Sequence, residues 1–152
     1  MSQTFSKEAL TYLTSALSPS VVETRQQGGR SLSYIPAYQI KAALTRVFGF
    51  GGWNWTLVSV DVKSPNLAVV HGRLEVPAYG IVYDGVGAGE SKVSADALDM
   101  AVKTADSEAL KRAASNLGTA FGLGLYANGS LADVVKTTYN KEQMEALRGD
   151  AD

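Results

Sequence analysis

The chain has 152 residues and a formal net charge of −1, with 45% hydrophobic and 19% charged residues. This length suits one domain with one modest core. Because the sequence contains no cysteine, disulfides, thiolate catalysis and cysteine-based zinc sites are excluded. No apolar run approaches the roughly 20 residues that span a bilayer, and the N-terminus lacks a signal-peptide pattern. Since nucleic-acid binders are often strongly basic, such a site here would have to be a local patch.

Two amphipathic helices are expected in the first third of the chain, joined by a polar connector. In residues 5–17, apolar side chains recur at helical spacing, and a proline follows. Residues 36–48 begin with a proline, carry a clean apolar stripe and precede Gly49, a natural C-terminal stop. The connector between them, residues 18–34, contains a glycine pair and is expected to be a loop.

The connector carries Arg25, Arg30 and Tyr34, which allow two interpretations. The first is a solvated loop, and the residues alone favour it. The second is an edge that faces phosphates, with an aromatic ring at its end.

Three strand-like runs follow, at residues 53–63, 67–76 and 79–87, and their short connections favour antiparallel pairing. In the middle run, two-residue alternation places valine and leucine side chains on one face and His71 with its charged neighbours on the other. Trp53 and Trp55 share a face of the first run, where they could anchor the core or form a binding platform. The core is favoured because an exposed tryptophan is costly.

One long helix is expected from near Val93 to residue 121, with a length of roughly 40 Å. Its apolar stripe is mostly alanine, so the helix could lie very close to a sheet. At 100° per residue, Lys92 and Lys103 project from nearly the same angle, and Lys111 and Arg112 lie further round. The predicted stripe consists of Ala95, Leu98, Val102, Ala105, Ala109 and Ala113.

The basic residues of this helix also have an ordinary explanation. Asp99 with Lys103, and Glu108 with Arg112, are spaced for i, i+4 ion pairs on a solvated helix face. From the residues alone, this explanation and a binding role stand about equal.

Signals for covalent chemistry are weak. His71 is the single histidine, and it is expected to face solvent rather than to act as a catalytic base. The run GVGAGESK, residues 85–92, resembles a phosphate-binding loop, but Glu90 and Ser91 separate the last glycine from Lys92, so the nucleotide-loop spacing fails. Its glycines are expected to let the strand turn sharply into the helix.

What remains is a set of basic and aromatic residues that could bind a single strand through phosphate charge and stacking. The set consists of Arg25, Arg30, Tyr34, Lys92, Lys103, Lys111 and Arg112.

Two blocks of this chain resemble the Rad52 family of single-strand-annealing proteins, in a short phage or bacterial form. The first block is RQQGGRSLSYIPAYQIKAALTRVFGFGGWNW, from Arg25 to Trp55. The second is GVGAGESKVSADALDMAVKTADSEALKRAASNLGTAFGLGLY, from Gly85 to Tyr126. Order and spacing agree through both blocks, and the resemblance covers about residues 5–127.

The resemblance implies a β-β-β-α core, a closed ring of subunits and a positively charged groove that holds single-stranded DNA with its bases displayed. The deep-groove positions of the family carry over to Arg25, Tyr34, Lys111 and Arg112. Lys92 matches a lysine near the outer lip, and Lys103 matches a basic place in the helix motif whose role is less defined.

Two departures from the family pattern stand out. Where the family often has a further arginine one turn after the Lys-Arg pair, this chain has Ser115. The sequence given also ends soon after the core, so the resemblance does not extend to the long region that recruits a recombinase in eukaryotic relatives.

The sequence therefore predicts an α+β protein with an antiparallel β-β-β-α core, N-terminal helices and one long helix packed on the sheet. Residues 1–127 are expected to form the annealing domain, and residues 128–152 a short helical or flexible extension. The predicted function is ATP-independent binding and annealing of single-stranded DNA in recombination and repair, without covalent chemistry or a cofactor. The alternative is a structural oligomer or protein-interaction module with incidental nucleic-acid contact.

The expected partners are single-stranded DNA and further copies of the chain in a ring, with a host single-strand-binding protein as a candidate and no membrane. The expected location is the cytoplasm of a bacterial or phage-infected cell, near the nucleoid.

Overall fold

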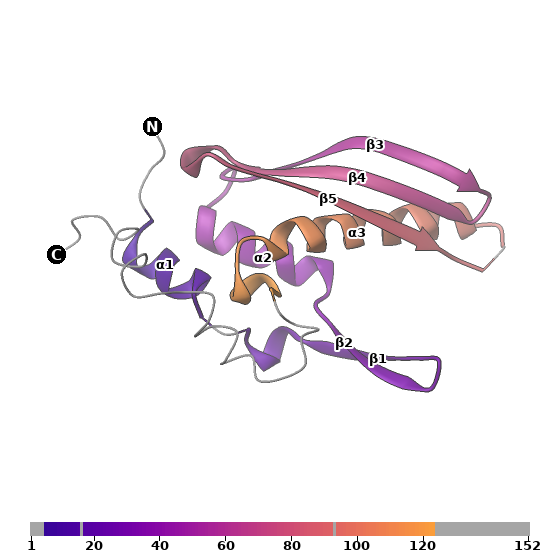
Figure 1. Cartoon of the computed structure of the whole chain (residues 1–152), viewed down its shortest axis with the longest axis horizontal. Helices are drawn as coiled ribbons and strands as arrows, with labels where there is room; N and C mark the ends of the chain where they lie inside the picture. The colour runs from indigo at the N-terminus through magenta and orange to yellow at the C-terminus, as the bar shows by residue number, and fades with distance from the viewer. Residues whose placement is uncertain (1–4, 16, 93, 124–152) are drawn as a thin grey trace.

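The computed structural model describes residues 5–15, 17–92 and 94–123, so the predictions for residues 128–152 lie outside the described part. The fold is α+β, as predicted, with a three-stranded antiparallel sheet and a long helix against it (Figure 1). The elements are α1 (Lys7–Leu13), η1 (Pro19–Val21), β1 (Glu23–Gln27), β2 (Arg30–Tyr34), α2 (Ala37–Phe48), β3 (Asn54–Ser64), β4 (Leu67–Val76), η2 (Pro77–Tyr79), β5 (Ile81–Glu90), α3 (Ala97–Ser115) and η3 (Thr119–Phe121).

Two layers make up the body of the molecule. The sheet has the order β3-β4-β5 with both pairs antiparallel, and α3 runs along one face of β4 and β5 (Figure 1). Residues of β4 alternate between buried and half-buried, and the buried set, which includes Val70 and Leu74, faces α3. The two-residue alternation predicted for this strand is thus confirmed.

The glycines before α3 do not form the predicted turn. They belong to β5, which continues to Glu90, and Gly85, Gly87 and Gly89 are buried on the face that meets the helix. A Cβ atom built on any of the three would overlap a backbone carbonyl oxygen of α3. Because glycine has no side chain, the helix backbone lies directly on the strand.

The start predicted for the long helix is wrong, and the apolar stripe predicted for it is only partly correct. The helix begins at Ala97, so Ala95 precedes it, and Leu98 is exposed. The fully buried stripe instead follows a strict four-residue step, because one i±4 ridge of the helix packs along the glycines of β5. Its members are Ala97, Ala101, Ala105, Ala109 and Ala113.

The main core lies where α1, α2, η3 and the end of α3 meet; Leu13, Leu44, Leu110 and Phe121 are buried there. The α1 helix is shorter than the predicted 5–17: it is capped at its start by Ser6, whose hydroxyl accepts from the Ala9 N–H at 3.1 Å. The α2 helix agrees closely with the predicted 36–48.

Both tryptophans pack against this core, as predicted, and each is also tied by its indole N–H. Trp53 donates to the hydroxyl of Thr45 at 3.1 Å. Trp55 donates to the Asp106 carboxylate at 2.8 Å, and this bond links β3 in the sheet layer to α3 in the helix layer.

The connector at 18–34, expected to be a loop, is largely a β-hairpin. Strands β1 and β2 pair antiparallel, with Glu23 opposite Tyr34, and the hairpin extends away from the body (Figure 1). Gly28 and Gly29 form its turn with φ values of 58° and 77°. A two-residue glycine turn with both φ angles positive matches the twist of hairpin strands, so the glycine pair was the missed signal.

Candidate nucleic-acid interface

The hairpin and α3 bring together three of the residues selected from the sequence. Arg25 and Tyr34 lie diagonally on one face of the hairpin, since Tyr34 pairs with Glu23 and Arg25 is two residues further along that strand. The Arg25 guanidinium carbon is 5.5 Å from the centre of the Tyr34 ring. The Lys111 ammonium of α3 is 5.6 Å from the same centre. Tyr34 therefore joins two cations from elements that are far apart in the sequence.

The tyrosine hydroxyl is also held. It donates to a carboxylate oxygen of Glu23 at 3.1 Å, and this bond is the main cause that raises the pKa of Tyr34 above 10. The ring is thus neutral at physiological pH. Tyr34 is half-buried. Each cation near its ring contributes about 0.5–1 kcal/mol, which is modest but orients both cations in the absence of a ligand.

The ion pair predicted for Glu108 with Arg112 is wrong. Glu108 instead binds Lys111, three residues away, with an O–N distance of 2.7 Å. Arg112 donates to the main-chain carbonyl of Val86 at 2.8 Å, on the edge of β5 that does not face β4. This bond uses one of the five N–H donors of the guanidinium, which leaves others for a phosphate.

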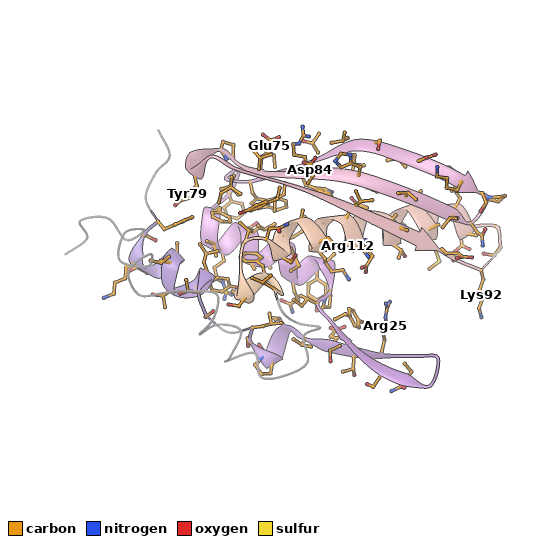
Figure 2. The ribbon with its side chains drawn as sticks, viewed as in Figure 1. Arg25, Glu75, Tyr79, Asp84, Lys92 and Arg112 are labelled. Atoms are coloured by element: carbon orange, nitrogen blue, oxygen red, sulfur yellow. The ribbon has the colours of Figure 1, made fainter. Side chains whose placement is uncertain are left out.

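Figure 2 shows Arg25 directed from the hairpin towards α3, and Arg112 on the side of α3 that faces the hairpin. Ser115, which departs from the family pattern, donates its hydroxyl to the Arg112 carbonyl at 2.7 Å. It supplies no charge to this surface, where Arg25 and Lys111 are the cations with a described contact to the Tyr34 ring.

The remaining selected residues lie apart from Tyr34. Lys92 is exposed in the loop after β5, at the far end of the sheet (Figure 2), and it precedes α3, so the predicted common angle with Lys103 does not apply. Lys103 forms the predicted ion pair with Asp99 at 2.8 Å, which raises its pKa. Arg30 begins β2 beside the glycine turn, and its side chain is outside the described part.

A second charged cluster, which sequence reasoning missed, lies on the outer face of the sheet. Arg73 donates twice to Asp84, at 2.8 and 3.1 Å, and His71 contacts the same carboxylate at 2.8 Å. The Arg73 bonds, then the His71 bond, lower the pKa of Asp84 to about 2. Arg73 and Asp84 are cross-strand partners, so the strand register was the signal, and a single strand pattern does not supply it. His71 is half-exposed and lies on the outer face of the sheet, as the strand alternation predicted.

The described part of the chain contains no group of three histidine, aspartate or glutamate residues that could hold a metal ion. Nor does it contain a helix of the length and hydropathy that crossing a membrane requires.

The described part of the chain is thus a β-β-β-α body with an added β-hairpin. The hairpin places the ring of Tyr34 beside Lys111 of the long helix, with the guanidinium of Arg25 near the same ring. Residues 6–144 match the Rad52/22 family of double-strand break repair proteins. The match covers most of the chain, so the chain belongs to this family.

Several similar relatives are fungal. The DNA repair and recombination protein rad22 of Schizosaccharomyces pombe is 28% identical over 152 residues, covering 90% of this chain and 32% of that protein. The DNA repair and recombination protein rhm52 of Pyricularia oryzae is 27% identical and covers 90% of this chain and 27% of its own length. The DNA repair and recombination protein radC of Emericella nidulans is 29% identical, and the match covers 79% of this chain and 23% of that protein. The chain therefore spans about a third or less of these relatives, and a phage or bacterial source stays a prediction.

Proposed function

We propose that this protein binds single-stranded DNA and anneals complementary strands, without ATP, in DNA repair and recombination. Membership of the Rad52/22 family and the names of the fungal relatives support the repair and recombination role. The observation that carries the DNA-binding proposal is the approach of Arg25 and Lys111 to the ring of Tyr34, with Arg112 next to Lys111 in α3.

The proposed mechanism requires no covalent step. Lysine and arginine neutralise phosphates and release counterions, which makes binding favourable and sensitive to salt. The Tyr34 ring already has one cation from the hairpin, Arg25, and one from α3, Lys111, close to it. We therefore assign Tyr34 the role of holding these two cations in place. A strand gripped by its phosphates keeps its bases free, and a complementary strand can then pair with less loss of chain entropy.

A homo-oligomeric ring is part of the proposal, and the two free edges of the sheet support it. β3 is an edge strand that α3 does not cover, and it exposes Leu57, Val60 and Val62. At the other edge, β5 exposes Val82 and Val86. Edge strands with exposed apolar side chains are prone to pair with another chain, and two different edges on one subunit favour head-to-tail contact, which can close a ring.

A ring would also explain how a chain with a net charge of −1 could bind DNA, because repetition would join local basic patches into a continuous track. In this proposal Lys92, Lys103 and Arg30 extend the basic track away from the cations at Tyr34. A host single-strand-binding protein as partner stays a prediction.

The test is annealing of two labelled complementary oligonucleotides, without nucleotide, at low salt. The wild type should accelerate pairing, and the double variant Lys111→Ala, Arg112→Ala should bind the single strand roughly 10- to 100-fold more weakly, as expected for two charge-assisted contacts. A matched control is Lys63→Ala, which removes a lysine paired with Asp61 on the outer side of β3.

Pairing no faster than the spontaneous rate would contradict the annealing proposal. No measurable single-strand affinity, together with an intact oligomer by light scattering, would favour the structural-oligomer alternative.

A further inference from the structure

Lys111 differs from the other described lysines that have an ion-pair partner. The Lys111 and Glu108 side chains are only 19% and 31% exposed, against 73% and 62% for Lys103 and Asp99. The pair of Lys63 with its aspartate is 54% and 57% exposed. Because water screens the attraction between exposed charges, we infer that the electrostatic attraction is strongest in the Lys111–Glu108 pair.

The position of Glu108 matters because the same ammonium lies near the Tyr34 ring. Lys111 has the carboxylate 2.7 Å away on its own helix and the aromatic ring centre 5.6 Å away on the hairpin. A DNA phosphate that approaches Lys111 meets a cation that is already paired. It must either displace Glu108, which then loses its ion pair, or share the ammonium with it, which brings two anions close together.

We propose that Glu108 is a built-in competitor for the DNA phosphate at Lys111 and thereby sets the affinity of the site. This inference rests on the proposed function. Glu108 keeps the ammonium paired and oriented in the free protein, and it regains that ammonium when DNA leaves. A strand-annealing protein must release its duplex product, so a moderate affinity at this site serves turnover.

Glu23 occupies a similar place on the hairpin, but it accepts a hydrogen bond from the Tyr34 hydroxyl rather than pairing with a cation of this group. Its removal would change the tyrosine rather than free a charge for phosphate. Glu108 is therefore the residue through which competition can be tested.

The test compares single-strand affinity for wild type, Glu108→Gln and the control Asp61→Asn, measured by fluorescence anisotropy with a labelled oligo-thymidine across a potassium chloride series. Glutamine keeps the size of the side chain and removes its charge. We expect Glu108→Gln to bind about 3- to 10-fold more tightly, with a salt slope steeper by up to about 0.7, the value for one more phosphate contact on a single strand. Asp61→Asn removes a carboxylate next to a lysine on the opposite side of the sheet and should leave both values unchanged.

A double-variant cycle separates competition from a general change of field. In the Lys111→Ala background, Glu108→Gln should alter affinity by less than about two-fold, because the contested cation is gone. An equal gain with and without Lys111 would overturn the inference in favour of simple long-range repulsion. Weaker binding by Glu108→Gln, with an unchanged melting temperature, would overturn it by making Glu108 an aid to binding.

The two proposals fail in distinguishable ways. If wild type shows no salt-sensitive affinity for the single strand, the proposed function fails. If wild type binds and Glu108→Gln does not differ from it, only the competition at Lys111 is rejected.

Discussion

The β5–α3 pair and the β1–β2 hairpin are built in opposite ways. Between β5 and α3, glycines face alanines, and the two backbones touch with almost no side chain between them. The hairpin extends from the body (Figure 1). It is joined to α3 by the contact between Tyr34 and Lys111. One half of the candidate interface is therefore fixed by backbone-to-backbone packing, and the other half is held by the contact of a half-buried tyrosine with a lysine side chain.

The largest expected effect is at the packed half. Gly87→Val would place a branched side chain against the backbone of α3, and we expect the free energy of unfolding to fall by about 3 kcal/mol. Urea denaturation measures this loss. Ala88→Val is the control, because Ala88 is exposed on the other face of the same strand, and it should change stability by less than about 0.5 kcal/mol. Equal effects of the two variants would refute the close packing.

At the join between the halves, the ring of Tyr34 is the feature to remove. Tyr34→Leu loses the contacts with Arg25 and Lys111, which together are worth about 1–2 kcal/mol, so single-strand affinity should fall roughly ten-fold. Tyr34→Phe keeps the ring and loses only the bond to Glu23, so its affinity should stay within about two-fold of wild type. Titration with a labelled oligonucleotide separates them, and a phenylalanine variant as weak as leucine would transfer the role to the hydroxyl.

Within the hairpin, Gly28→Ala and Gly29→Ala each place a side chain at a positive φ, at a cost of about 1 kcal/mol. We expect faster amide hydrogen exchange in β1 and β2, with unchanged protection in β4 and β5, because the hairpin opens separately from the sheet. Loss of protection throughout the protein would contradict this separation.

The smallest effect concerns Asp84, which lies outside both halves. Its pKa is about 2 in the folded protein and 3.8 ordinarily, so its pairing with Arg73 and His71 stabilises the fold above pH 3.8. That contribution should be lost as the pH falls towards 2, and Asp84→Asn should show a shallower acid dependence of its melting temperature over this window. An identical acid dependence in the two proteins would show that the cluster does not influence folding.

The sequence predicted β4 and α2 because each carries a clear apolar period, and the long helix was predicted from a weaker stripe that is mostly alanine. It did not predict the hairpin, because the polar residues from Glu23 to Tyr34 carry no apolar alternation and the glycine pair was interpreted as a loop. It also misplaced the glycines of β5, since a strand with glycine at every inward position has no hydrophobic face to detect.

The candidate interface could be named from residue types and family resemblance, but not assembled. The distance between Tyr34 and Lys111 depends on how the hairpin folds back towards α3, and no periodicity encodes that contact. Helical spacing allowed Glu108 two partners of like charge, at three and four residues. The Val86 carbonyl decides between them by taking Arg112, and that carbonyl comes from a different element.

The glycine strand and alanine helix also have a consequence for recognising this fold elsewhere. Gly85, Gly87 and Gly89 repeat every two residues, and the buried alanines of α3 repeat every four, so both elements advance in step, at about 6–7 Å per repeat in the strand and 6 Å in the helix. The two repeats have nearly equal lengths, so the pattern can be recognised in a single sequence. It is GxGxG in the strand, followed by alanines at every fourth position in the helix. Such a pair would identify a strand and helix in backbone contact even where no hydrophobic pattern marks either one.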